Sequence, residues 1–368
     1  MVGGGQLARM SAQAAIGLGI DFRVLAASAG DSAAQVTAGT TVAAVDSGEA
    51  LAAFAAGCDV VTFDHELVPP EQLAALEQAG HVLRPGRLTQ RFAQDKAHQR
   101  AMLGALGVPV PLHRVVGSVD ELAMFGDELG WPVVLKAIRG GYDGRGIWVL
   151  DDPRGAVHLF EPGREYLAET FLPLNQELAV LVARRPGGET MTYPVVQSVQ
   201  VEGMCREVIY PAPVPATVGA HAQGLALRIA DAVEAVGIIA CELFLVNETL
   251  VLNEIAVRPH NSGHFSIEGC ATSQFENHLR AVLDWPLGLT TPAAPAAVMV
   301  NVVGGTAGVD PRSRAALALN VPGVHLHLYG KEPRPGRKLG HVTALGDDPA
   351  EAGARARRAA ALLTTGEG

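Results

Sequence analysis

The sequence predicts an α/β protein with two or three domains. Its 368 residues are 48% hydrophobic and include 42 glycines and 23 prolines, which is typical of a globular protein rich in turns. A chain of this length is too long for one ordinary domain. Strand-like and helix-like segments alternate from residue 1 to about residue 88, which indicates an α/β unit at the start of the chain.

The composition excludes several classes of binding partner and cellular location. The sequence contains no run of 18 uninterrupted apolar residues and no charged-then-apolar leader with a cleavage site, so we expect a cytoplasmic protein that neither enters a membrane nor is secreted. Four widely spaced cysteines form no CxxC pair, which predicts reduced thiols. The net charge of −10 argues against a nucleic-acid surface, so any phosphate recognition must be local.

The first motif is a glycine turn at residues 3–5, which predicts a helix beginning at Gln6. Such a turn presents unpaired N–H groups to an anion. A dinucleotide fingerprint is not supported, because the last glycine is misplaced and no acidic residue closes the following strand near Leu25. Two interpretations of the turn stay open: it contacts another anionic ligand, or it only packs the helix on the strand. Because Met1 and Val2 leave almost no strand before the turn, we expect either an upstream start or a shortened one.

Further elements follow in order. We expect strands at residues 22–25, 59–63, 133–137, 146–150, 166–173 and 177–182, and helices at residues 87–107, 220–236 and 354–363, the last one packed on the surface. Lys136 lies inside an apolar strand, where its charge needs a partner, and phosphate contact is favoured over a surface role. The loop at 138–145 contains three glycines and is suited to approach a ligand closely.

A β-hairpin near residue 248 holds two acidic residues in apolar strands. The apolar runs 241–246 and 250–255 flank a turn at 247–249. If the turn is centred on Glu248, Val246 pairs with Leu250 and Glu242 lies opposite Glu254. Their Cβ atoms would then be about 5 Å apart on one face.

Two carboxylates this close repel each other unless a proton or a cation lies between them. Mg²⁺, which binds through one or two carboxylates plus substrate phosphates, is the expected ion. The hairpin therefore predicts a site for a nucleoside triphosphate.

Several motifs together resemble one enzyme family, the N5-carboxyaminoimidazole ribonucleotide synthetases, which are ATP-grasp enzymes of de novo purine synthesis. The motifs are GGGQLARM, KAIRGGYDGRG, CELF…LNEIAVRPHNSGH, SQFENHLRA and HLHLYGKEPRPGRKLGH, spread from Gly3 to about His341. The paired glutamates alone would indicate ATP-grasp enzymes in general. The strings GGYDGRG, RPHNSGH and RPGRKLGH are the ones that point to this family.

The resemblance implies an α/β, three-domain ATP-grasp fold with an N-terminal doubly wound (pre-ATP-grasp) domain. Residues 1–95 would form this substrate-binding domain, 96–168 a central lid, and 169–368 a C-terminal domain with the metal hairpin and a phosphate-binding loop. It also implies a homodimer and a reaction without biotin. ATP and bicarbonate would give carboxyphosphate, whose carboxyl group reaches 5-aminoimidazole ribonucleotide.

The resemblance also assigns the nucleotide site. Glu242 and Glu254 match the ligands of Mg²⁺, with Mn²⁺ as an alternative ion. Lys136 matches a phosphate contact and Arg87 a second basic contact. The remaining ATP contacts implied are the hinge Glu169, Thr170, Phe171 and Leu172, the ribose acceptor Glu177, and Asn253.

For the ribonucleotide, Arg337 and Lys338 resemble a 5′-phosphate clamp with Lys331 nearby, since arginine offers a planar fork and lysine a point charge. Gln6 and Glu66 resemble contacts from the N-terminal domain. The resemblance places Tyr142, Asp143, Arg145, Arg258, His260 and Asn261 at the reacting groups. Whether His260 acts as a general base or as a hydrogen-bond donor stays open.

The chain departs from the family at two places. Val257 stands where proline is usual, which predicts a slightly less rigid loop, and Asp64-His65 replaces the commoner pair of glutamate and an apolar residue. Two other functions are weighed. Formate-dependent glycinamide ribonucleotide transformylase would share the hairpin but should lack the HNSGH and GRKLGH strings. A non-catalytic nucleotide-binding protein should lose the metal carboxylates or Lys136, and this chain keeps them.

Overall fold

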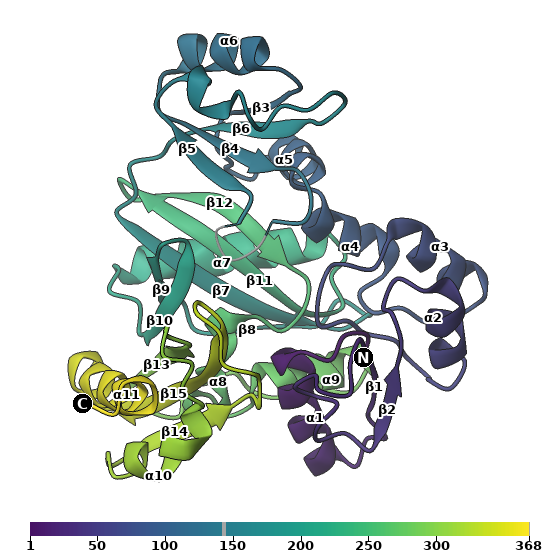
Figure 1. Ribbon diagram of the computed structural model, residues 1–368, viewed down its shortest axis with the longest axis vertical. Helices are drawn as coiled ribbons and strands as arrows, with labels where there is room; N and C mark the ends of the chain where they lie inside the picture. Colours follow the sequence, from purple (N-terminus) through teal and green to yellow (C-terminus); the bar gives the residue numbers. More distant parts are fainter. Residues whose placement is uncertain (142–144, 368) are drawn as a thin grey trace.

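The computed structural model describes residues 1–141 and 145–367. Within these ranges the strands form a two-stranded, a four-stranded and a nine-stranded sheet. Figure 1 shows the four-stranded sheet at one end of the molecule and the N-terminal unit beside the large sheet. No helix of the described ranges is long and apolar enough to cross a membrane.

The N-terminal unit is built around a short parallel pair, β1 (Arg23–Ala26) and β2 (Gly39–Val42). Val2 forms parallel bridges to both Leu25 and Phe63 and so lies between them. The expected strand at 59–63 is present only as isolated bridges of this kind. The helices of this unit are α1 (Gln6–Leu18), α2 (Gly48–Ala55), α3 (Pro70–Gln78) and α4 (Arg87–Gln94).

The four-stranded sheet is antiparallel, in the order β3-β6-β4-β5. Its strands are β3 (His113–Val116), β4 (Val133–Ala137), β5 (Ile147–Leu150) and β6 (Tyr166–Thr170). Helix α6 (Val119–Leu129) buries Leu122 and Phe125 in the core of this sheet. The single helix expected at 87–107 is wrong: α4 ends at Asp95, which leaves the helical conformation and caps α5 (Lys96–Ala105) by accepting from the His98 N–H.

The large sheet is antiparallel, in the order β12-β11-β7-β9-β10-β13-β15-β14, with β8 added on β7. The strands are β7 (Gln176–Arg184), β8 (Thr190–Thr192), β9 (Val196–Val201), β10 (Met204–Tyr210), β11 (Gly237–Val246), β12 (Thr249–Ala256), β13 (Ala296–Val303), β14 (Val324–Leu328) and β15 (Lys338–Gly346). The short helical elements between these strands are η2 (Asn261–Gly263), α8 (Ser266–Gly269), η3 (Pro311–Arg314) and α10 (Ala315–Ala318).

Helices cover both faces of this sheet. Alternate residues of β7 enter opposite cores, because side chains alternate along a strand. Leu178 and Val180 pack with α7 (Ala216–Ala232), whereas Ala179 and Leu181 share a core with Phe265 and with α9 (Gln274–Val282). The central strands are therefore rigidly placed.

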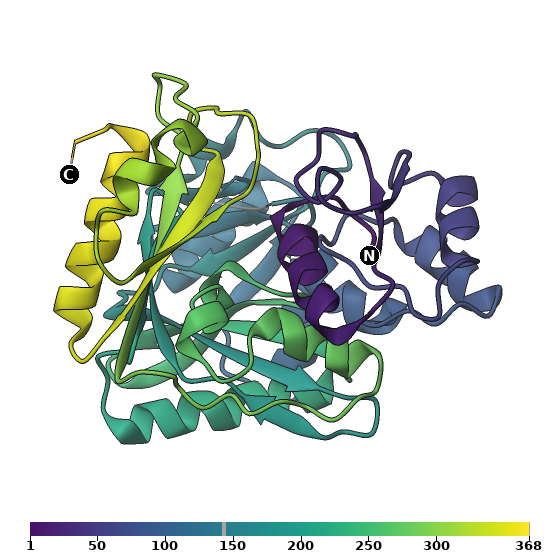
Figure 2. The ribbon, with the colours of Figure 1, turned by 90° about the horizontal axis from the view of Figure 1, so that it is seen from below.

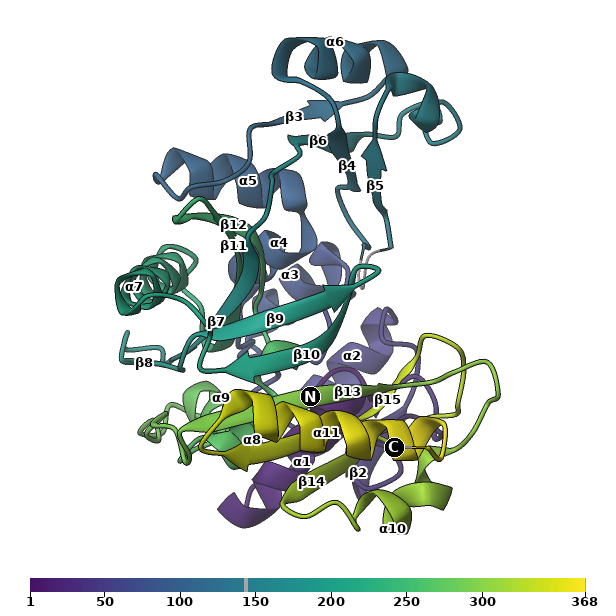
Figure 3. The same ribbon diagram turned by 90° about the vertical axis from the view of Figure 1, so that its left-hand side faces the viewer.

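The C-terminal helix α11 (Pro349–Thr364) is longer and more buried than expected. It lies along β13 and β15 (Figures 2 and 3). Its alanine-rich face, including Ala352, Ala356 and Ala359, is fully buried in a core with strand residues such as Val298. The helix packs on the outside of the sheet as expected, and its small alanine side chains let it approach the strands closely.

Candidate active site

The hairpin of β11 and β12 brings Glu242 opposite Glu254, as predicted, but through a different register. Asn247 and Glu248 both have positive φ angles (46° and 68°) and form a two-residue turn. Val246 therefore pairs with Thr249, and the expected pairing with Leu250 is wrong. A β-bulge follows after the Leu243–Leu252 pair and adds one residue, Asn253, to β12. The bulge compensates for the shorter turn and restores the glutamate pair.

The surroundings shift the pKa values of the two carboxyl groups in opposite directions. Burial and the nearby carboxylates of Glu254 and Glu177 raise the pKa of Glu242. Burial acts in the same direction on Glu254, but Lys96 and Lys136 outweigh it and lower the pKa of Glu254. In the described part of the chain, no group of three or more His, Cys, Asp or Glu side chains is arranged to hold a metal ion by itself. Two neighbouring carboxylates suit a hard divalent ion that also takes phosphate oxygens.

A buried basic cluster faces this pair. Lys136 Nζ forms an ion pair with Glu169 Oε2 at 2.8 Å and donates to Asn253 Oδ1 at 3.2 Å. Lys136 and Glu169 are 5% and 2% exposed, and burial lowers the pKa of Lys136 while Glu169 opposes that shift. The predicted need of Lys136 for a partner is thus met within the chain by Glu169.

Two members of this cluster were missed from the sequence. Lys96 Nζ lies 3.1 Å from Glu254 Oε2, and Arg100 Nε lies 2.6 Å from Glu169 Oε1. Arg100 also donates to the backbone carbonyl of Asn253. Both basic residues lie four positions apart on α5, and this spacing, which places them on one helix face, was the available signal.

The predicted hinge at 169–172 begins in the last two residues of β6 and continues beyond the strand. Glu169 turns its side chain into the basic cluster, and Phe171 beyond the strand end is 47% exposed. Glu177 lies on β7, where burial raises its pKa to about 7 against the opposing charge of Lys136. Arg87, at the start of α4, forms an ion pair with Glu77 at 3.5 Å.

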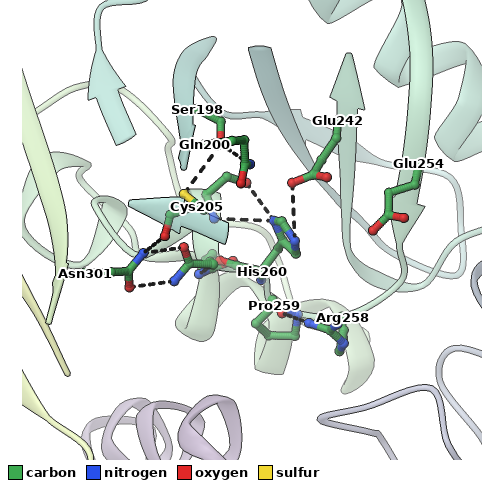
Figure 4. Close-up of polar contacts among 12 residues, drawn as sticks. Ser198, Gln200, Cys205, Glu242, Glu254, Arg258, Pro259, His260 and Asn301 are labelled. Carbon is green, nitrogen blue, oxygen red and sulfur yellow. Dashed lines mark hydrogen bonds and ion pairs between the residues drawn. The ribbon is translucent and has the colours of Figure 1, made fainter. Parts of the chain in front are cut away.

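The loop after β12 connects the glutamate pair to the N-terminal unit. His260 Nε2 lies 3.6 Å from Glu242 Oε1 (Figure 4). The His260 Nδ1 lies 2.9 Å from Ser262 Oγ. Arg258 Nε is 2.9 Å from Glu66 Oε1. These contacts bring three predicted residues, His260, Arg258 and Glu66, to the same side of the hairpin.

Asn261 makes a structural contact with one hydrogen and one oxygen lone pair of its amide. Its amide and that of Asn301 on β13 donate to each other at 3.0 and 2.8 Å, and Asn301 also donates to the Cys205 carbonyl at 3.0 Å (Figure 4). The pair fastens the loop to the sheet. Sequence reasoning missed Asn301, which carries no motif of its own.

A cleft of about 450 Å³ lies next to the loop. Four predicted residues line it, Gln6, Arg258, Lys331 and Arg337, together with the glycine turn. Lys331 donates to Gln6 across the cleft. The cleft therefore joins the first helix of the chain to the segment between β14 and β15.

The glycine turn donates a hydrogen bond to a carboxyl group of the same chain. The Gly5 N–H donates to Asp64 Oδ2 at 2.6 Å, and the Asp64 carboxyl is buried. Gly3 has a φ of 102°, and a Cβ there would meet Asp64 Oδ1 at 1.7 Å, so this position requires glycine. Asp64 therefore accepts one of the turn's N–H groups within the chain, and burial raises the pKa of its carboxyl.

The remaining predicted residues lie around these groups. The charge of Lys338 opposes the rise in the pKa of Glu242, which places Lys338 near the glutamate hairpin, while the neighbouring Arg337 lines the cleft. Arg145 is exposed. Tyr142 and Asp143 lie outside the described residues.

Three domain families match the chain: a ribonucleotide synthetase preATP-grasp domain over residues 1–94, an ATP-grasp domain over 101–275, and a phosphoribosylaminoimidazole carboxylase C-terminal domain over 297–355. The N5-carboxyaminoimidazole ribonucleotide synthase of Mycobacterium tuberculosis (strain H37Rv) is 46% identical over 376 positions, which cover 100% of this chain and 87% of that protein.

Solved structures are similar over almost the whole chain. The N5-carboxyaminoimidazole ribonucleotide synthetase of Thermus thermophilus has a TM-score of 0.88 at 37% identity, covering 99% of both chains. The N5-carboxyaminoimidazole synthase of Aspergillus clavatus, in complex with ADP and 5-aminoimidazole ribonucleotide, has a TM-score of 0.88 at 33% identity, covering 98% of both chains.

Proposed function

Because the chain belongs to the N5-carboxyaminoimidazole ribonucleotide synthase family of ATP-grasp enzymes, which use ATP in purine biosynthesis, we propose that it carboxylates 5-aminoimidazole ribonucleotide with bicarbonate. The observation that carries this proposal is the continuity of the site. The loop at 258–261 joins the Glu242–Glu254 pair to the cleft at Gln6 and Arg337. A phosphoryl donor bound at the glutamate pair and a ribonucleotide bound in the cleft would meet at His260.

ATP is held between the lid and the large sheet. The hinge at 169–172 contacts the adenine, Glu177 accepts from the ribose hydroxyls, and Lys136 with Arg87 offsets phosphate charge. Glu242 and Glu254 would hold Mg²⁺, or Mn²⁺ in its place, and the ion when bound supplies neutralisation of charge at the terminal phosphates.

The reaction has two transfers. A bicarbonate oxygen attacks the γ-phosphorus of ATP, and the bond from that phosphorus to the bridging oxygen breaks. The products of this step are ADP and carboxyphosphate. The exocyclic amine nitrogen of the ribonucleotide then attacks the carboxyl carbon, directly or after release of CO₂. The carbon–oxygen bond to phosphate breaks and the nitrogen loses a proton.

The chain's own residues orient these groups. Arg337, Lys338 and Lys331 hold the 5′-phosphate, and Gln6 and Glu66 contact the ribonucleotide from the N-terminal unit. His260, Arg258 and Asn261 contact bicarbonate or substrate, and Tyr142, Asp143 and Arg145 close over the site. No biotin takes part. A cytoplasmic homodimer and functional units at 1–95, 96–168 and 169–368 complete the proposal.

The test is ADP release with Mg²⁺, ATP and bicarbonate, with and without 5-aminoimidazole ribonucleotide. Strong stimulation by the ribonucleotide, with label from isotopically labelled bicarbonate appearing in it, is the expected result. ADP release that ignores the ribonucleotide would remove the assignment. Stimulation by formate with glycinamide ribonucleotide would support the transformylase instead.

A further inference from the structure

Gln274, the first residue of α9, holds both backbone groups of His260. Its Oε1 accepts from the His260 N–H at 2.8 Å, and its Nε2 donates to the His260 carbonyl at 2.8 Å. The side-chain amide thus pairs with one residue as a neighbouring β-strand would. Gln274 is fully buried, so water does not replace these bonds.

The Gln274 amide makes a third hydrogen bond with its second N–H hydrogen. Gln274 Nε2 lies 3.0 Å from His264 Nδ1. An amide nitrogen has two hydrogens, and one is already given to the His260 carbonyl, so the other is donated to His264 Nδ1. Every hydrogen of the Gln274 amide is therefore assigned, and its orientation is fixed by its partners.

Gln274 stands on a rigid base. The Ser273 side chain caps α9 by accepting from the Glu276 N–H, and the Gln274 N–H donates to Ser266 Oγ at 2.9 Å. Next to it, Phe275 is buried in a cluster with Leu7, Met10 and Tyr329 from the N-terminal unit and from the segment that follows β14. Helix α9 is thereby held against both sides of the cleft.

We propose that Gln274 is a positioning residue for the reaction: by holding the backbone of His260 it fixes the His260 imidazole beside Glu242. This inference rests on the proposed function, because it takes His260 to contact bicarbonate or substrate. Gln274 acts through His260 and does not touch the reacting groups. A displacement of about 1 Å at such a contact lowers rates by about 100-fold.

The chain contains a matched control one turn further along α9. Asn277 Oδ1 accepts from the Gly288 N–H at 2.7 Å, and its Nδ2 donates to the Gly288 carbonyl at 3.1 Å and to the Tyr193 hydroxyl at 2.9 Å. Asn277 is also fully buried. It makes the same three kinds of bond, but it holds Gly288 and not the loop of His260.

The experiment compares Gln274→Met with Asn277→Leu in the full chain. Each change keeps the volume similar and removes three buried hydrogen bonds, so both variants should lose similar thermal stability. Gln274→Met should lower kcat about 10- to 100-fold and leave the KM for ATP within about twofold. Asn277→Leu should leave both constants within about twofold. Equal kinetics in the two variants would overturn the proposal.

Two further variants keep the proposal testable if Gln274→Met does not fold. Gln274→Asn retains the amide but is one methylene too short to reach both His260 groups, so kcat should still fall. In a His260→Ala background, either change at Gln274 should add less than about a twofold effect. An undiminished effect there would overturn the positioning role. A fully active His260→Ala variant would instead reject the role of His260 in the proposed function.

Discussion

The proposed nucleotide end of the site and the proposed ribonucleotide cleft are built differently. At the nucleotide end, Lys136, Glu169 and Arg100 are at most 5% exposed and neutralise one another before any ligand arrives. The cleft is an open space of about 450 Å³, and Arg337 at its edge is only partly buried. Charges buried in a low-dielectric setting act strongly on each other, whereas partly exposed charges are screened.

This difference predicts which property each substitution changes. A change at the nucleotide end should affect phosphoryl transfer or folding, because its groups are coupled through buried ion pairs. A change at the cleft should affect ribonucleotide binding alone. Each prediction below sets one end against the other.

The largest effect is expected for Glu254→Ala. The variant loses one of the paired carboxylates and leaves Lys96 without its partner, so ATP turnover should fall by about 10³-fold. Ribonucleotide binding, measured by calorimetry, should stay within about twofold. Glu248→Ala, at the exposed tip of the same hairpin, is the control and should be fully active. Normal turnover in Glu254→Ala would reject the metal assignment.

A large loss of stability is expected for Arg100→Met. Glu169 would lose one of two cationic partners and the Asn253 carbonyl its donor, so the free energy of unfolding should fall by about 3 kcal/mol. Urea denaturation measures this value. Arg337→Ala in the cleft should cost less than about 0.5 kcal/mol. Similar losses in the two variants would remove the contrast between the ends.

The fold, the family and the glutamate pair could be predicted from the sequence, whereas two local features of the hairpin could not. The ATP-grasp fold and the family were predicted correctly, as the matched domains and relatives confirm. The glutamate pair was predictable because hairpin partners are neighbours along the chain. Even so, two local features were missed, the turn at Asn247-Glu248 and the bulge at Asn253, and their effects on the register cancelled.

Contacts between segments that are distant in the sequence could not be predicted from neighbouring residues in this way. Asp64 reaches Gly5, Asn301 reaches Asn261, and Arg100 reaches Glu169 only after the sheets have packed. Apart from the four-residue spacing of Lys96 and Arg100, nothing in the neighbouring sequence marks these pairs as partners. The sequence motifs therefore identified individual residues of the site. The hydrogen bonds and ion pairs that connect these residues could be found only in the tertiary structure.

A pH dependence is expected at the nucleotide end. Burial raises the pKa of Glu177 to about 7, so the carboxyl is mostly protonated below pH 7 and ionised above it. A neutral carboxyl accepts more weakly from the ribose hydroxyls. The KM for ATP should therefore rise by up to about tenfold from pH 8 to pH 6.

Glu177→Gln separates this effect from the titration of ATP itself. The variant should show a raised KM for ATP at pH 8 and a flatter profile, because its amide does not titrate. The KM for the ribonucleotide serves as the internal comparison and should not follow Glu177. An unchanged profile in the variant would place the ribose acceptor elsewhere.

The smallest effect is expected in the cleft. Arg337→Ala should raise the KM for the ribonucleotide by about fivefold at low salt and leave the KM for ATP unchanged, because one partly exposed charge–phosphate contact contributes about 1 kcal/mol. The increase should shrink at about 0.5 M salt as the wild-type contact is screened. Arg334→Ala is the matched control on the same loop, since its exposed guanidinium is paired with Glu332 at 2.5 Å. Equal effects of the two substitutions would show that general positive charge, and not the Arg337 fork, attracts the ribonucleotide. A change in the KM for ATP would mean that the two ends are coupled through this loop, against the separation argued above.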